Sequence, residues 1–190
     1  MNRTLTTPWK PTKAQLFAAR NKLVPDLIAK NLIVLFAGIN PGLYTAAVGR
    51  HFARPGNRFW PALRDSGFTD RLLSPFEERA LLERGLGITN VAGRATASAD
   101  ELSRDELTDG ARKLEVSVRR YKPRALAVLG LGAYRTAFGR RDAGLGPQAE
   151  MIGTTRVWVL PNPSGLNAHY QPKDLARLFT ELRRVIEALA

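Results

Sequence analysis

Two asparagines at the ends of apolar runs offer the most suggestive chemistry in this chain. Asn40 lies in G-I-N-P-G after one β-branched run, and Asn162 lies in L-P-N-P-S-G-L after another. Short apolar runs that stop at Gly, Asn and Pro are typical of buried strands that end in tight turns. Open α/β sheets bind ligands beyond the carboxyl ends of their strands. We therefore expect the two amides to face each other across one pocket, as in an enzyme.

Residue types that are scarce in the chain exclude several kinds of site. The 190 residues include no Cys, which excludes disulfides, thiolate nucleophiles and iron–sulfur clusters. His51 and His169 are the only imidazoles, so a zinc site would need carboxylates to complete it. We expect neither a metal nor another cofactor.

The charge balance points to a polyanionic partner. Lys and Arg number 29 against 17 acidic residues, which gives a net charge of +12 and a pI of about 10.8. Such an excess most often serves nucleic-acid binding, although a merely soluble basic surface is the alternative. No predicted helix pairs a strongly apolar face with a solidly basic one, and the N-terminus lacks the apolar core of a secretory signal. We expect a soluble, intracellular protein that does not bind membranes.

The elements that must position the two asparagines alternate between strands and helices. Apolar runs predict strands at residues 32–37, 87–91, 125–129 and 156–160. Capping boxes and helical periodicity predict helices at residues 12–22, 57–65, 74–85, 103–121, 131–138 and from about 172 onward, with a Gly-rich loop through Gly146-Pro147. This order predicts one three-layer α/β/α domain at residues 12–190, with a mostly parallel sheet of four to five strands. Residues 1–11 are expected to form a basic arm.

Together, the segments 38–60 and 160–167 closely resemble the mismatch-specific uracil/thymine-DNA glycosylases of the uracil-DNA glycosylase superfamily. The resemblance runs from about Leu32 to the C-terminal helix and includes N-R-F-W and Y-K-P-R-A-L-A-V-L-G. It implies that the protein flips a base out of the duplex and hydrolyses its N-glycosidic bond.

The resemblance also assigns the residues of the base pocket. Asn40 would orient the attacking water and touch the base, and Phe52 would stack on the flipped pyrimidine. The backbone amides of Ile39 and Phe52 would read the base edge. Asn162 stands where the broader superfamily usually has His, and a neutral amide stabilises a departing uracil anion less well. Tyr44 would border the region that admits or excludes a 5-substituent, whereas Phe59 and Trp60 are expected in the core, which is also the alternative for Phe52. His51 is expected on a solvated loop, and the alternative is a histidine beside the pocket that tunes the leaving base.

The resemblance further assigns contacts to the duplex. Leu166 would fill the hole left by the flipped nucleotide, although a loop leucine lying on the surface is the alternative. Ser164 and Gly165 would meet the backbone or the orphaned guanine. Arg54 and Arg58, with Arg50 and Arg94, are candidate phosphate contacts, and solvated surface charges are the alternative for each.

Asp100 is a candidate for activating water, because an asparagine takes no proton from water. It follows the second strand among small residues, and the resemblance implies an uncharged Asn or a Lys at this place in the family. We hypothesise that Asp100 supplements or replaces Asn40 in this role. The alternative is a surface acid that precedes the next helix.

Function follows from the two segments together. We expect a monofunctional DNA glycosylase, because neither segment contains a lysine for a Schiff base. Its substrate would be double-stranded DNA that contains uracil or a mismatched pyrimidine. We expect a monomer that lies in the bacterial cytoplasm and associates with the nucleoid. The alternative is a non-catalytic binder of mismatched or abasic DNA on the same fold. A dinucleotide-dependent oxidoreductase is disfavoured because V-L-G-L-G-A-Y-R lacks the third glycine of that fingerprint.

Overall fold

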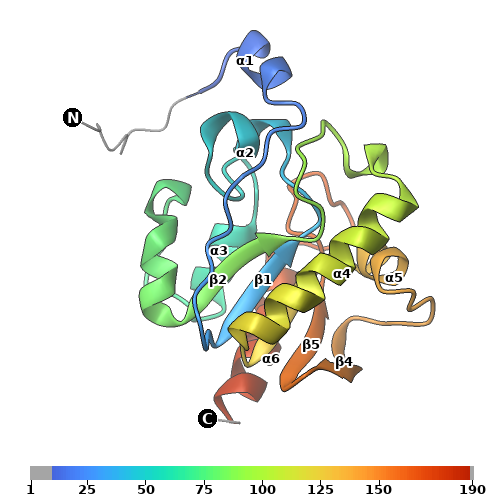
Figure 1. The fold of residues 1–190 in the computed structure, drawn as a ribbon. Helices are drawn as coiled ribbons and strands as arrows, with labels where there is room; N and C mark the ends of the chain where they lie inside the picture. The colour runs from blue at the N-terminus through green and yellow to red at the C-terminus, as the bar shows by residue number, and fades with distance from the viewer. Residues whose placement is uncertain (1–9, 189–190) are drawn as a thin grey trace.

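A five-stranded sheet forms the centre of the protein in a computed structural model that describes residues 10–188. The strand order is β2-β1-β3-β5-β4 (Figure 1). The first four of these strands are parallel and β4 pairs antiparallel to β5, in agreement with the predicted fold class. The strands are β1 (Val34–Gly38), β2 (Leu86–Asn90), β3 (Ala125–Leu129), β4 (Gly146–Ile152) and β5 (Thr155–Leu160).

Helices cover both faces of the sheet and complete the three layers. One face packs against α3 (Phe59–Asp65), the 3-10 helix η1 (Pro75–Arg84) and α6 (Pro172–Glu187). The other face packs against α4 (Arg104–Tyr121) and α5 (Leu131–Ala137). Successive strand residues point to opposite faces, so on β1 Phe36 joins the first core and Leu35 joins the second. Phe59 and Trp60 are buried, as predicted.

Side-chain caps fix where several helices begin. Ser103 and Glu106 form the predicted capping box at the start of α4, and Ser74 and Glu77 form another at η1. Each box satisfies two backbone N–H groups that the first turn leaves without partners. The short 3-10 helix η2 (Ala99–Glu101) precedes α4.

Three local features differ from the sequence-based expectations. The predicted helix 12–22 is limited to α1 (Lys13–Ala18), and Asn21 has a left-handed backbone. Helix α2 (Leu43–Val48) was not predicted, and β4 begins at Gly146 where a loop was expected. An edge strand tolerates Pro147 because one of its sides needs no ladder partner. Most of the expected basic arm, residues 1–9, lies outside the described residues.

The carboxyl ends of the four parallel strands meet at one edge of the sheet. After β1 the chain pairs β2 on one side and then β3 on the other, which makes the β1–β3 boundary a topological switch point. The strand ends at Gly38 and Leu160 carry the two Asn-Pro turns to this edge. Within residues 10–188, no helix is long and apolar enough to cross a membrane.

Candidate active site

A cavity of about 450 Å³ lies at the carboxyl edge of the sheet and brings both Asn-Pro segments together. The first segment contributes Gly38, Ile39, Asn40, Pro41, Gly42, Thr45, His51, Phe52, Arg54 and Asn57. The second contributes Asn162, Ser164 and Leu166. The remaining wall comes from Asn90, residues 96–100 and Leu129. The two segments that carry the resemblance therefore surround one space.

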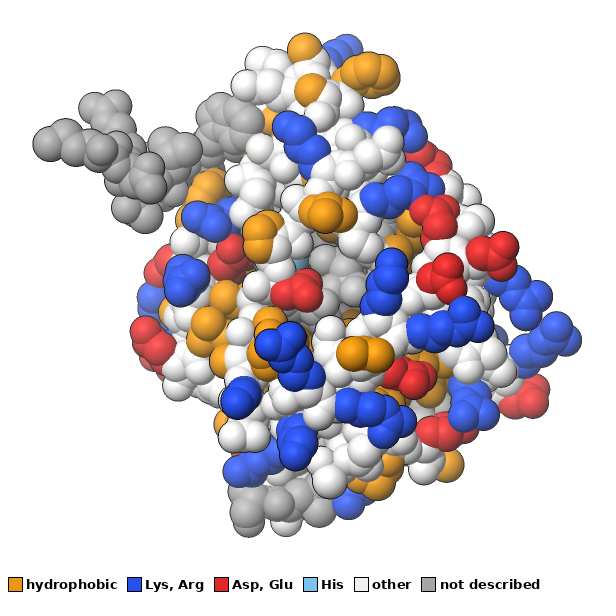
Figure 2. Space-filling view, in the orientation of Figure 1, with side chains coloured by type: hydrophobic (Ala, Val, Ile, Leu, Met, Phe, Trp, Pro, Cys, Tyr) orange, Lys and Arg blue, Asp and Glu red, His pale blue; other side chains and the backbone are white. Residues whose placement is uncertain are grey.

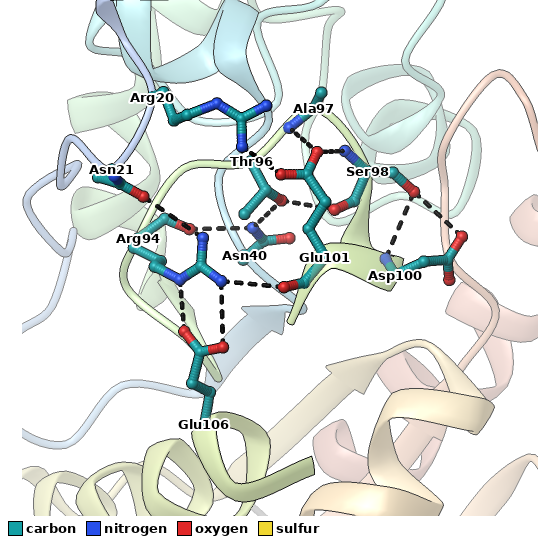
Figure 3. Close-up of polar contacts among 10 residues, drawn as sticks. All are labelled: Arg20, Asn21, Asn40, Arg94, Thr96, Ala97, Ser98, Asp100, Glu101 and Glu106. Carbon is teal, nitrogen blue, oxygen red and sulfur yellow. Dashed lines mark hydrogen bonds and ion pairs between the residues drawn. The ribbon is translucent and has the colours of Figure 1, made fainter. Parts of the chain in front are cut away.

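The amide of Asn40 is held in one orientation. Its Nδ2 donates to the carbonyl oxygen of Arg94 at 2.9 Å and to Thr96 Oγ1 at 2.7 Å. Thr96 Oγ1 in turn donates to the carbonyl oxygen of Ser98 at 2.7 Å (Figure 3). Since a carbonyl only accepts, the nitrogen of Asn40 must face Arg94. Oδ1 is left as an acceptor on a residue that lines the cavity, suited to hold a water by one of its O–H groups.

Two ion pairs hold the segment that binds Asn40. Arg94 pairs with Glu106 on α4, and Arg20 pairs with Glu101 on η2 (Figure 3). The other carboxylate oxygen of Glu101 accepts from the backbone N–H groups of Ala97 at 3.0 Å and Ser98 at 3.2 Å. The hydrogen bond from Arg94 is the largest cause that lowers the pKa of Glu106, to about 2. Arg94 thus braces the cavity wall and is not an unpaired phosphate contact.

Phe52 lines the cavity with an unusual backbone. Its φ of 52° is left-handed, a conformation that costs a bulky residue about 1–2 kcal/mol. Its ring stacks on Phe59, with centroids 4.2 Å apart, and packs against the core beneath. A Cβ on Gly38 would lie 3.3 Å from the Phe52 ring and 2.7 Å from Asn90 Oδ1, so any larger residue there would have to displace the Asn90 side chain. Phe52 is therefore both a core residue and a wall of the cavity.

Hydrogen-bond donors without partners gather on residues that line the cavity. Asn162 Oδ1 accepts from the N–H of Ser164 at 3.0 Å, which leaves the Nδ2 of Asn162 as a donor without a partner among the described residues. The backbone N–H groups of Ile39 and Phe52 also make no hydrogen bond within residues 10–188. A ligand with carbonyl oxygens would suit such a cavity, because each donor is then satisfied.

Arg58 holds the loop after β5 through hydrogen bonds within the protein, and its guanidinium is not the free phosphate contact that we expected. Its guanidinium donates to the carbonyl oxygens of Tyr170, Ser164 and Asn167, the last two at 2.6 Å. Gly165 lies so close to the carbonyl of Gly56 that a Cβ would collide with it. The loop is thereby fixed at both ends while Leu166 stays 75% exposed, the exposure expected of a residue that inserts into DNA.

The other predicted residues occupy varied positions. Asp100 is exposed on η2 at the cavity wall, and its Oδ2 accepts from Ser98 Oγ at 3.1 Å. Arg54 is exposed, lines the cavity and has no side-chain partner among the described residues. Tyr44 lies on α2 beside the cavity-lining Thr45 but does not line the cavity itself. His51 is buried and lines the cavity, contrary to the expected solvated loop, and its Nε2 lies 3.0 Å from the carbonyl oxygen of Pro25.

Arg50 is also paired within the protein and is not the free phosphate contact that we expected. Its guanidinium lies 3.2 Å from a carboxylate oxygen of Glu78, and the other oxygen of Glu78 accepts from the N–H of His51 at 2.9 Å. Glu78 is buried, so these bonds compensate its desolvation. Arg50 therefore serves to hold the turn that places His51 and Phe52.

The Uracil DNA glycosylase superfamily model matches residues 25–185. The chain belongs to this superfamily. Its fold is also similar to the solution NMR structure of a Methanosarcina acetivorans protein described as a "putative Uracil DNA glycosylase". That match has a TM-score of 0.57 and 18% sequence identity, over 86% of this chain and 98% of the other. The family match supports a hydrolytic DNA N-glycosylase activity, and the structural match supports the fold.

Two residues of the candidate active site were not identified from the sequence. Asn90 ends β2, and its side-chain amide lines the cavity without a hydrogen-bond partner among the described residues. Thr96 is 1% exposed and holds Asn40. The signal for Asn90 was available, because it is a third asparagine at the end of an apolar run. Thr96 carried no such signal, since its partner lies far away in the sequence.

Proposed function

We propose that this protein is a monofunctional DNA glycosylase that removes uracil from mismatched duplex DNA. One observation carries the proposal: the two Asn-Pro segments enclose a single cavity whose asparagines offer an oriented acceptor and a free donor. None of the described residues that line this cavity is a lysine, so the chemistry is hydrolysis without a Schiff base.

The arrangement of donors favours uracil over cytosine. Nδ2 of Asn162 and the N–H groups of Ile39 and Phe52 would donate to the base carbonyls, whereas the exocyclic amine of cytosine would meet a donor. The amide of Asn90 has both a donor and an acceptor and would pair with the remaining edge of the base. The ring of Phe52, backed by Phe59, would stack on the pyrimidine.

In the reaction, the bond between the sugar and the base breaks and a water oxygen bonds to the sugar carbon. Asn40 Oδ1 would orient this water, and Nδ2 of Asn162 would stabilise the negative charge on the leaving base. Asp100 is the only carboxylate among the described residues that line the cavity. We assign it the proton that the water loses. A neutral donor at position 162 makes easily flipped, mispaired bases the preferred substrates.

The direct test is single-turnover cleavage of a duplex with one uracil:guanine pair, followed by alkali and a gel. We expect the purified protein to cut it, and we expect Asn40→Ala and Asn162→Ala to slow cleavage about 100-fold each. Asp100→Asn should slow it by at least the same factor. A full rate in Asp100→Asn would refute the role of Asp100 while leaving the activity in place.

The alternative on this fold is a binder of mismatched or abasic DNA that performs no chemistry. It would bind the same duplex tightly and give no alkali-labile product. That outcome, with uracil, thymine and 5-modified pyrimidines each placed opposite guanine, would refute glycosylase activity. The exposed Leu166 would insert into DNA under either function, so its substitution does not separate the two.

A further inference from the structure

Three arginines line a hollow that the candidate active site does not use. Arg104 at the start of α4, Arg135 on α5 and Arg141 after α5 line about 310 Å³, together with Thr136 and Gly139. No acidic residue contributes to this lining. We call these residues the arginine pocket. Figure 2 shows Lys and Arg side chains at the right-hand edge of the molecule, where Figure 1 places α5.

None of the three arginines of the arginine pocket forms an ion pair within residues 10–188. Most other arginines near the cavity have acidic partners, such as Arg20 with Glu101 and Arg50 with Glu78. Neither Arg104 nor Arg141 makes an ion pair or a side-chain hydrogen bond with residues 10–188. Arg104 is moreover the first residue of α4, where the helix dipole disfavours a cation. Placing these cations together opposes folding, so an anionic ligand is the natural reason for the cluster.

The third arginine is already held in place. Nε and one terminal nitrogen of Arg135 donate to the carbonyl oxygen of Ala143, at 2.9 and 2.7 Å. Its guanidinium therefore loses little freedom when its remaining N–H groups bind a ligand. The planar guanidinium matches the geometry of phosphate oxygens and makes bidentate contacts with them.

The arginine pocket is close along the chain to residues that line the candidate active site. Arg104 follows η2, whose Asp100 lines the cavity, and α5 begins shortly after Leu129, which also lines it. Helices α4 and α5 pack against each other. We propose that the arginine pocket binds backbone phosphates of the DNA strand where it leaves the cavity. This proposal rests on the proposed function, because it takes the cavity as the place of the flipped nucleotide.

The test compares Arg104→Ala/Arg141→Ala with a control of equal charge, Arg119→Ala/Arg156→Ala. The control residues lie at the amino edge of the sheet, near the end of α4 and the start of β5, and have no acidic partner among the described residues. Binding to a duplex with an abasic-site analogue is measured against salt concentration. Two lost phosphate contacts reduce the slope of log K against log salt by about 2. We expect this reduction in the first variant and little change in the control.

Methylphosphonate substitution locates the contact. Neutralising one phosphate at a time near the abasic analogue should weaken binding of the wild-type protein at one or two positions. At those positions the Arg104→Ala/Arg141→Ala variant should show no further loss. Equal salt slopes in the two double variants, or equal sensitivity of wild type and variant at every phosphate, would overturn the proposal.

The two proposals fail in different ways. If the wild type cuts uracil:guanine duplex and the salt slopes are equal, the arginine pocket alone is refuted. If no base is released but the slopes differ as expected, the proposed function is refuted and phosphate binding by the pocket stands.

Discussion

The orientation of the Asn40 amide, on which its proposed role depends, is set in part by Thr96. The hydroxyl of Thr96 accepts from Asn40 Nδ2 and donates to the carbonyl of Ser98, and Thr96 itself is fully enclosed. A methyl group in place of the hydroxyl would leave Asn40 Nδ2 with the carbonyl of Arg94 as its one remaining partner among the described residues. The Asn40 amide would then be less firmly oriented toward the water.

We expect Thr96→Val to lower kcat about 10- to 100-fold with a smaller change in KM. Thr96→Ser, which keeps the hydroxyl, should recover most of the rate. Single-turnover cleavage of the uracil:guanine duplex measures both variants, and thermal unfolding confirms that each is folded. A folded Thr96→Val with the wild-type rate would contradict the positioning role.

Single residues were predictable when the signal was local. Asn40 and Asn162 end apolar runs, and the structure places both on one cavity. The burial of His51 was not predictable, because its partners, Pro25 and Glu78, lie 26 and 27 residues away. The pairing of Arg50 and Arg94 with acids was missed for the same reason: an arginine next to a binding motif looks the same in sequence whether or not an acid neutralises it.

At the scale of elements, the loop after β5 depends on Arg58. Three backbone carbonyls of the loop share one guanidinium, whose Nε is buried and has no partner within residues 10–188. We expect Arg58→Met to lower the free energy of unfolding by about 2 kcal/mol or more. Loosening the Leu166 loop should also slow single-turnover cleavage about tenfold.

Urea unfolding and the cleavage assay together check Arg58→Met. The matched control is Arg177→Met on α6, which breaks an exposed pair with Glu181 and should change stability by less than about 1 kcal/mol. Equal stability and activity of the two variants would show that the loop holds its shape without Arg58.

The start of α4 responds to pH through Glu106. Its pKa is lowered from 4.5 to about 2, chiefly by the hydrogen bond from Arg94. A depressed carboxyl pKa stabilises the folded state above pH 4.5, and this contribution disappears as the pH falls toward 2. We expect Glu106→Gln to lower the melting temperature at pH 7 and the difference from wild type to shrink in that window. A difference that stays constant down to pH 2 would contradict this.

Elements with their own start and stop signals were predicted well. The capping box at Ser103 and the apolar run at residues 125–129 gave α4 and β3 with correct boundaries. Helix α2 was missed because it is short, has no side-chain cap and is braced by the bridge between Gly42 and Thr96. β4 was missed because its pairing with β5, and not its own residues, makes it a strand.

At the scale of the whole molecule, a second buried donor besides Arg58 Nε has no partner among residues 10–188. Trp158 on β5 is buried between the sheet and α6, and its Nε1–H has no hydrogen-bond partner within the described residues. We expect Trp158→Phe to change the free energy of unfolding by less than about 1 kcal/mol, because removing an unsatisfied donor offsets the lost packing. Phe179→Ala in the same core should cost about 3–5 kcal/mol. Urea unfolding measures both, and a loss of similar size in Trp158→Phe would contradict this balance.

The cavity has one tightly constrained wall and one open wall. On the constrained wall, a methyl group on Gly38 fits only if the Asn90 side chain moves, and Phe52 holds a left-handed backbone. On the open wall, residues 97–99 are small, and each is exposed or half-buried, so larger side chains have room there. New base preferences should therefore arise by enlarging side chains at 97–99, and a directed-evolution library for altered lesions is best confined to that short stretch.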